Sequence, residues 1–285
     1  MQSENKNRPK ILKDYSLEPR TLGELIDLSV NVFKDNFQQY IVLSLIIYSP
    51  IFLLNIILPF STAIGRESPG CFFFLLAIFA VIGAMMCWTF LITAVAIFTS
   101  EIFKHNYLTY KEAVRLAKEK FWSVLAVIII SNVFIFFISF LTIGLSFLLL
   151  KAGDAGASSV VGILIVVFLG INYAAYLVFR YTLAPYVVLF EDMRGLDALR
   201  RSSALFHSSW DAVIKISLIP FVIPIMMMVF SLIPFVGGFL SIFIASLPII
   251  ATTLLYYDIR LRTEGFDLEI SAERMMKEIA EAQDR

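Results

Sequence analysis

FWSVLAVIIISNVFIFFISFLTIGLSFLLL (Phe121–Leu150) runs for thirty residues without a charged side chain. An α-helix rises about 1.5 Å per residue, so about 20 apolar residues cross the ~30 Å hydrocarbon core of a bilayer. A second uncharged run, Ile216–Tyr257, is forty-two residues long, or about 63 Å as a helix. It is therefore expected to form two spans joined at Pro234–Gly238. The sequence predicts an all-α fold, a polytopic transmembrane helical bundle with six spans. Together with Phe121–Leu150, four uncharged runs are long enough to cross a bilayer: Ile41–Phe60, Cys71–Ser100, Ala155–Phe179 and Ile216–Tyr257.

The composition and the placement of charge agree with this prediction. The chain is 59% hydrophobic and 16% charged, whereas soluble domains are about half apolar and about a quarter charged. Of the 23 Lys and Arg residues, only Arg66 and Lys151 fall in the first, third and fifth connections. Because short cytoplasmic loops carry the excess of Lys and Arg, both termini are expected in the cytoplasm. The expected location is therefore a membrane.

A short amphipathic pattern occurs three times, each time directly before a span. With Glu24 placed over Asp197, TLGELIDLSVNVFKDNFQQY (Thr21–Tyr40) aligns without a gap to RGLDALRRSSALFHSSWDAV (Arg194–Val213). A third segment, TYKEAVRLAKEKFWSVLAV (Thr109–Val127), keeps the order of acid, base and aromatic residue. We call these three segments the interfacial segments. They predict a pseudo-threefold repeat.

This repeat sets the expected domain organisation. The repeat units are about 21–103, 104–192 and 193–262, inside a membrane domain at 21–270. A cytoplasmic tail at 1–20 precedes this domain, and a charged cytoplasmic helix at 271–285 follows it.

Each interfacial segment is typical of an amphipathic helix that lies at the cytoplasmic membrane surface. In the Arg194–Val213 segment, Leu196, Leu199, Phe206 and Trp210 recur at three- and four-residue steps, which predicts an apolar face toward the acyl chains. Arg200 and Arg201 are expected to face headgroups or water. Aromatic side chains hold such helices at headgroup depth, and the expected anchors are Phe37, Phe121 and Trp210. The segments either set topology and depth alone, or also bind anionic lipid or a cytoplasmic partner.

One ionisable residue stands out inside a span. Arg180 lies in the fourth apolar run, a few residues before Pro185, which is expected to kink or end the helix. Ionisable groups within a membrane are functional candidates. Glu191 or Asp258 can pair with Arg180 to clamp adjacent helices, and the alternative is a contact with a substrate or a lipid headgroup. We expect Tyr257–Glu269 to cap the cytoplasmic side of the bundle, with Asp258 close to a basic residue such as Arg180.

The sequence carries no signal for catalysis. His105 and His207 lie on separate segments without a Cys or carboxylate at metal-ligand spacing, so no metal site is expected. The sequence contains no G-x-S-x-G hydrolase motif, no H-E-x-x-H metalloprotease motif and no glycine-rich phosphate-binding loop. We therefore expect a non-enzymatic protein with no cofactor and no catalytic residues. Its expected partners are membrane lipids or another membrane or cytoplasmic protein, and no nucleic acid.

Three motifs together resemble a known family. They are LGELIDLSVNVFKDNF (22–37), FRYTLAPYVVLFEDMRGLDALRRS (179–202) and TLLYYDIRLRTEGFDLE (253–269). In this order they are similar to the bacterial membrane-domain family named after glycerophosphoryl diester phosphodiesterase. The resemblance implies a six-helix integral membrane protein, and the expected location is the bacterial cytoplasmic membrane. The phosphodiesterase domain that is fused to some members has no counterpart here, so the resemblance does not carry hydrolase activity over to this chain.

Two function classes follow. The first is a lipid-binding or partner-binding scaffold in the membrane. The second is a transporter or permease for a lipid-like or amphipathic solute, because Pro220 and Pro224 can break a span as in transporter solute sites. A polar cavity at mid-membrane containing Asn132, Asn172 or Tyr173 would favour transport.

Overall fold

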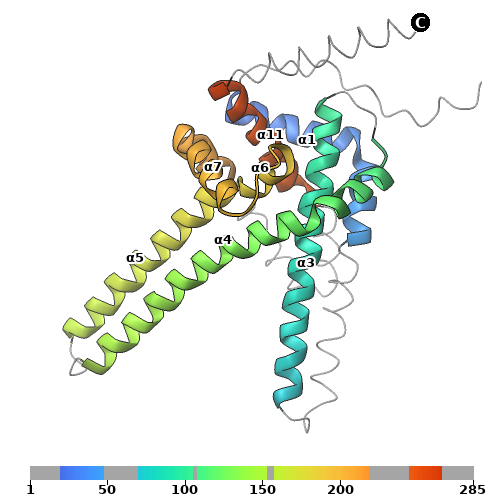
Figure 1. Ribbon diagram of the computed structural model, residues 1–285. Coiled ribbons are helices and arrows are strands. Elements are labelled where there is room, and N and C mark those ends of the chain that lie inside the picture. The colour runs from blue at the N-terminus through green and yellow to red at the C-terminus, as the bar shows by residue number, and fades with distance from the viewer. Residues whose placement is uncertain (1–19, 48–69, 105–107, 153–156, 218–243, 265–285) are drawn as a thin grey trace, which may run out of the picture. The chain divides into compact units, whose positions relative to one another are not determined.

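The computed structural model describes residues 20–47, 70–104, 108–152, 157–217 and 244–264, and every element in these ranges is a helix. The prediction of an all-α fold is confirmed for this part of the chain (Figure 1). The elements are α1 (Leu22–Asp35), an apolar helix at Phe37–Ile47, α3 (Gly70–Phe103), α4 (Tyr110–Ala152), α5 (Ala157–Tyr181), α6 (Ala184–Phe190), α7 (Gly195–Ser208), α8 (Trp210–Ser217) and α11 (Ser246–Glu264).

Three of these helical stretches are long and apolar enough to cross a membrane: Ile78–Phe103, Tyr110–Lys151 and Val160–Phe190. They correspond to the predicted second, third and fourth spans. The predicted first, fifth and sixth spans fall partly outside the described residues. The same holds for the Pro234–Gly238 hairpin, for Pro220 and Pro224, for most of the tail at 1–20, for the fold-back after Glu264 and for the helix at 271–285.

Contacts between residues divide the chain into two compact units. The first unit contains Met1–Trp122 and Lys215–Arg285, and the second contains Ser123–Ile214, so α4 contributes residues to both. This division differs from the three predicted repeat units. It differs because α7, which the repeat places in the third unit, packs against α5 and α6 of the second.

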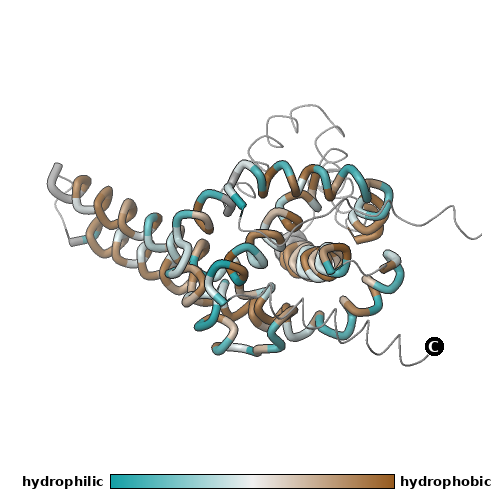
Figure 2. The backbone as a smooth tube through the Cα atoms, turned by 90° about the horizontal axis from the view of Figure 1, so that it is seen from above, coloured by the Kyte–Doolittle hydropathy of each residue, from teal (hydrophilic) through white to brown (hydrophobic). Residues whose placement is uncertain are grey.

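In the second unit, α4 and α5 lie side by side as a hairpin (Figures 1 and 2). Gly170 lies close to Thr142 of α4: an added Cβ there would lie 2.8 Å from the Thr142 Cβ. Small residues allow such close packing of membrane helices. The outer surface of the hairpin is apolar: Phe136 and Phe140 are 70% and 75% exposed. In water such a surface would be unfavourable, whereas hydrocarbon covers it at little cost.

Hydroxyl groups join the helices of the first unit. Tyr40 Oη lies 2.9 Å from Thr99 Oγ1, Ser44 Oγ lies 2.7 Å from Ser246 Oγ, and Ser100 Oγ lies 2.6 Å from Tyr257 Oη. All six side chains are buried. These hydrogen bonds connect the Phe37–Ile47 helix to α3 and α11, and α3 to α11. Hydrogen bonds of this kind stabilise membrane helix pairs by roughly 0.6–2 kcal/mol each.

Two of the interfacial segments form helices with corresponding bounds. α1 and α7 each contain 14 residues, and Thr21 and Arg194, which precede them, are aligned positions in the sequence comparison. Both helices then break, at Asn36 and Ser209, and the aligned residues Phe37 and Trp210 begin the next helix. The third interfacial segment behaves differently, because α4 continues without a break past Phe121.

The apolar face of α7 does not face acyl chains as a whole, contrary to expectation. Leu199 and Phe206 are buried, in a helix that packs against α5 and α6. α5 ends at Tyr181, close to Pro185 as predicted, and the short, almost wholly buried helix α6 follows. α6 thus provides a protein surface for α7, and only Leu196 and Trp210 of the predicted face remain exposed.

Candidate functional site

The charged residues singled out in the sequence lie at two junctions, one in each unit. Asp258 lies on α11 in the first unit, and Arg180, Glu191, Arg200 and Arg201 lie around α5, α6 and α7 in the second.

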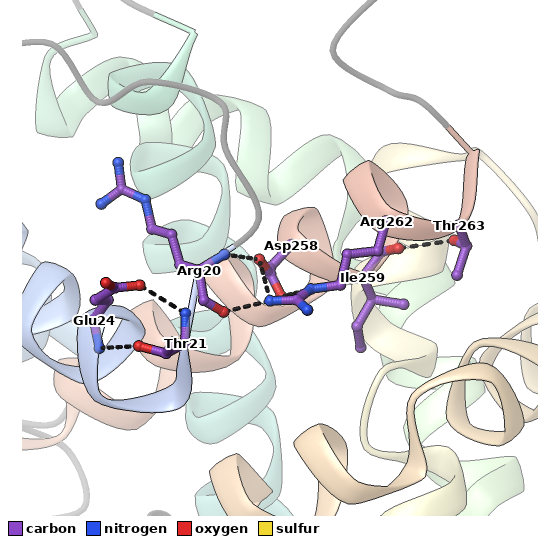
Figure 3. Close-up of polar contacts among 7 residues, drawn as sticks. All are labelled: Arg20, Thr21, Glu24, Asp258, Ile259, Arg262 and Thr263. Atoms are coloured by element: carbon purple, nitrogen blue, oxygen red, sulfur yellow. Dashed lines mark hydrogen bonds and ion pairs between the residues drawn. The ribbon is translucent and has the colours of Figure 1, made fainter.

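Asp258 holds the backbone of Arg20, in an arrangement that we call the Asp258 clasp. Asp258 is only 4% exposed. Its Oδ1 accepts a hydrogen bond of 2.9 Å from the Arg20 amide, and Arg262 Nε donates to its Oδ2 at 2.8 Å. Arg262 Nη2 donates to the Arg20 carbonyl, while the Arg20 guanidinium points away from Asp258 (Figure 3). Asp258 therefore lies against a basic residue, but this residue is Arg262, one turn along the same helix.

α1 begins immediately after the clasp. Thr21 and Glu24 form a capping box: Glu24 Oε2 accepts from the Thr21 amide at 2.7 Å, and the Glu24 amide donates to Thr21 Oγ1 at 3.5 Å. These hydrogen bonds lower the pKa of the exposed Glu24 carboxyl, first through the Thr21 amide and then through its hydroxyl, because both stabilise the ionised form. The capping box and the clasp together place the start of α1 on α11.

The Asp258 clasp borders a small cavity lined mainly by leucines of α1 and α11 and by Phe103 of α3. The cavity has room for roughly one water molecule. Asp258 is already engaged by Arg20 and Arg262. This geometry is that of a structural joint between α1 and α11.

Arg180 joins α5 to α7. Its Nε donates to Ser203 Oγ at 2.7 Å, and Ser202 Oγ donates to the Arg180 carbonyl at 2.8 Å. The guanidinium also lies over two tyrosine rings, 5.9 Å from the centre of Tyr176 and 5.7 Å from that of Tyr181. We call these five residues the Arg180 junction. A cation over an aromatic ring gains roughly 0.5–2 kcal/mol, more where water is excluded.

The two other arginines of this region have carboxylate partners. Arg201 Nε donates to Glu191 Oε2 at 2.8 Å, and both side chains are largely buried. Arg201 therefore does not face headgroups or water as expected, and Glu191 has this partner in place of Arg180. Arg200 is 81% exposed and lies 3.5 Å from Asp197, an exposed pair that contributes roughly 0–1 kcal/mol.

The pair between Arg180 and Asp258 stays a prediction, because the two residues belong to different units. Sequence reasoning missed Arg262, Arg20, Ser202 and Ser203. The i, i+4 spacing of Asp258 and Arg262 is a usable signal for the first of these. The clasp on Arg20 joins residues 238 positions apart and has no local signal.

The predicted aromatic anchors differ in exposure. Phe37 and Trp210 are exposed, as a headgroup anchor requires. Phe121 is half-buried, and its ring centre lies 5.8 Å from that of Phe90 on α3. The neighbouring Trp122 is 69% exposed and is the better candidate for this role. Its adjacency to Phe121 and the preference of Trp for membrane interfaces are signals in the sequence.

The polar groups that would favour a transport cavity make local contacts. The amide nitrogens of Asn132 and Asn172 donate to the carbonyls of Ile128 and Phe168 on their own helices. Within the described ranges, no group of three or more His, Cys, Asp or Glu side chains is arranged to hold a metal ion. Comparisons with protein-family models, with curated proteins and with solved structures find no match. An inference on function therefore rests on how the residues are arranged in the structure.

Proposed function

We propose that this chain is a non-enzymatic, multi-pass protein of the bacterial cytoplasmic membrane that binds lipid or a partner protein as a scaffold. The observation that carries the proposal is the long α4–α5 hairpin, whose exposed surface is aromatic and aliphatic along its length. α7, which follows α5 and α6 in the chain, instead contains charged residues and serines along its length. A membrane protein that works through surface contacts has this distribution of polar and apolar groups.

We extend the proposal to six spans in a pseudo-threefold repeat. The corresponding bounds of α1 and α7 support it. The helices against which these two pack also correspond. α1 packs against α11, and α7 packs against α5. α11 and α5 each carry a Tyr-x-x-x-Arg motif within their last three turns. Arg260 lies 6.0 Å from the Tyr256 ring centre in α11, and Arg180 lies 5.9 Å from the Tyr176 ring centre in α5. The motif resemblance to the phosphodiesterase membrane-domain family favours the same architecture.

The proposed topology predicts which positions a membrane-impermeant thiol reagent reaches. In a chain whose two native cysteines are replaced, single cysteines at Arg66, Lys151 and Gly237 are expected to react in intact cells. Cysteines at Lys111, Arg200 and Glu269 are expected to react only after the membrane is opened, because they lie on the cytoplasmic side. Reaction of Arg200→Cys in intact cells would contradict the six-span arrangement.

The proposed function is tested by what stays bound when the chain leaves the membrane. We expect the full chain, extracted with its surrounding bilayer into polymer nanodiscs, to retain either an enriched lipid class or a protein partner in fixed proportion. Mass spectrometry of the nanodiscs, compared with nanodiscs of an unrelated six-span protein, measures both. A lipid composition equal to that of the bulk membrane, without a protein partner, would contradict the proposal. Enrichment of an amphipathic solute would favour the transporter.

A further inference from the structure

The two Tyr-x-x-x-Arg motifs differ in how their arginine charge is neutralised. Arg260 Nε donates to Glu264 Oε2 at 2.9 Å, one turn along α11. The equivalent position after Arg180 is Ala184, which has no carboxylate. The same motif therefore carries an internal counter-charge in the first unit and none in the second.

Arg180 has unused hydrogen-bond donors. A guanidinium has five N–H groups, and the Nε group is taken by the neutral Ser203 hydroxyl. Within the part of the chain that the structure describes, no carboxylate lies at ion-pair distance from Arg180 and no group accepts from its two terminal nitrogens. Glu191 is paired with Arg201. The carbonyl end of α5 offers roughly half an elementary negative charge, which leaves the guanidinium only partly neutralised.

The position of Arg180 on its helix fits a lipid headgroup. α5 contains 25 residues and is about 37 Å long, so its last turn lies near the headgroup level when the helix crosses a ~30 Å core. Leu169 and Tyr173, about three and two turns before Arg180 and on the same face of α5, are exposed and offer an apolar surface to an acyl chain. Guanidinium groups bind phosphate in a bidentate manner, through two parallel N–H···O bonds.

We propose that the Arg180 junction binds a phosphate group, namely that of an anionic membrane phospholipid whose acyl chain lies along α5. This inference rests on the proposed lipid-binding function and names the ligand class and the residue. Ser203 and the two tyrosine rings hold the guanidinium at the end of α5, and its terminal nitrogens receive the phosphate oxygens. Free phosphate has the same chemistry but lacks the acyl chain, so it is expected to bind far more weakly.

The test is a lipid titration of the purified full chain in detergent, followed by native mass spectrometry. The probes are phosphatidylglycerol, phosphatidylcholine and inorganic phosphate. We expect the wild type to prefer phosphatidylglycerol, and Arg180→Gln to weaken its binding at least tenfold. Arg200→Gln, which removes an exposed arginine on α7, is the matched control and is expected to change binding less than twofold. Ser203→Ala disturbs the junction without removing charge, so it should retain most of the binding.

The alternatives give different results. Equal phosphatidylglycerol binding by the wild type and Arg180→Gln overturns this site while leaving the lipid-binding function intact. Equal losses in Arg180→Gln and Ser203→Ala would show that Arg180 acts only as a structural joint. Arg180-dependent binding of inorganic phosphate without binding of phosphatidylglycerol would overturn the lipid as its source. If Arg180→Gln does not fold, Arg180→Lys, which keeps the charge but lacks the planar fork, is expected to bind several-fold more weakly, and wild-type binding by Arg180→Lys overturns the proposal.

Discussion

Gly170→Ala is expected to destabilise the protein by about 1–3 kcal/mol, the usual cost of forcing an added group into occupied space. The new methyl group would lie closer than 3.0 Å to three side-chain atoms of Thr142, including its Cβ at 2.8 Å. Real Cβ atoms do not tolerate such contacts, so α4 and α5 must separate locally around Thr142. The midpoint of thermal unfolding of the full chain in nanodiscs measures this loss.

Gly144→Ala is the matched control for this prediction. Gly144 lies inside α4 of the same hairpin, and an added Cβ there meets no atom within 4 Å. Its unfolding midpoint is expected to stay at or above that of the wild type. Thr142→Ala removes the two atoms that the Gly170→Ala methyl group meets most closely, so the double variant should recover part of the loss. Equal midpoints for Gly170→Ala and Gly144→Ala would contradict the close approach of the two helices.

Asp258→Ala is expected to cost about 2–4 kcal/mol, because it leaves the Arg262 guanidinium and the Arg20 amide without their shared acceptor. Arg262 is 44% exposed and can recover part of its hydration, which keeps the expected loss below that for a fully buried pair. α1 should loosen from α11, since the clasp fixes the residue directly before the α1 capping box. Hydrogen exchange at the start of α1 and the unfolding midpoint are the two measurements.

Asp197→Ala provides the comparison for Asp258→Ala. It also removes an aspartate from an aspartate–arginine pair within one helix, but Asp197 and Arg200 are 75% and 81% exposed. Its expected effect is within about 0.5 kcal/mol. Asp258→Asn keeps one oxygen acceptor and should fall between the two. Equal effects of Asp258→Ala and Asp197→Ala, with unchanged exchange in α1, would show that the clasp does not hold α1.

The elements that could be predicted are those whose signal is local. The thirty uncharged residues from Phe121 to Leu150 predict a long apolar helix, and α4 covers all of them. Pro185 predicts the end of the preceding helix, and α5 stops at Tyr181. The alignment of Thr21–Tyr40 with Arg194–Val213 predicts two similar helices, and α1 and α7 have corresponding bounds.

The environment of α7 could not be predicted in this way. Its periodicity identifies an apolar face, but the same face can be covered by acyl chains or by protein. α6, a helix of only 7 residues, decides between them by placing a buried surface beside Leu199 and Phe206. So short a helix has no periodic signal of its own.

The sequence by itself determined the helical class of the described residues, the positions of their long apolar helices and the similarity of α1 and α7, because apolar length, proline and short residue patterns act over a few neighbouring residues. Only the tertiary structure decided the partners of the charged groups. Glu191 binds Arg201, Arg180 binds Ser203, and Asp258 binds Arg262 and the backbone of Arg20. Neighbouring residues on a helix point about 100° apart, so the partner of a charged side chain depends on which face of its helix meets another helix. That packing joins segments far apart in the sequence.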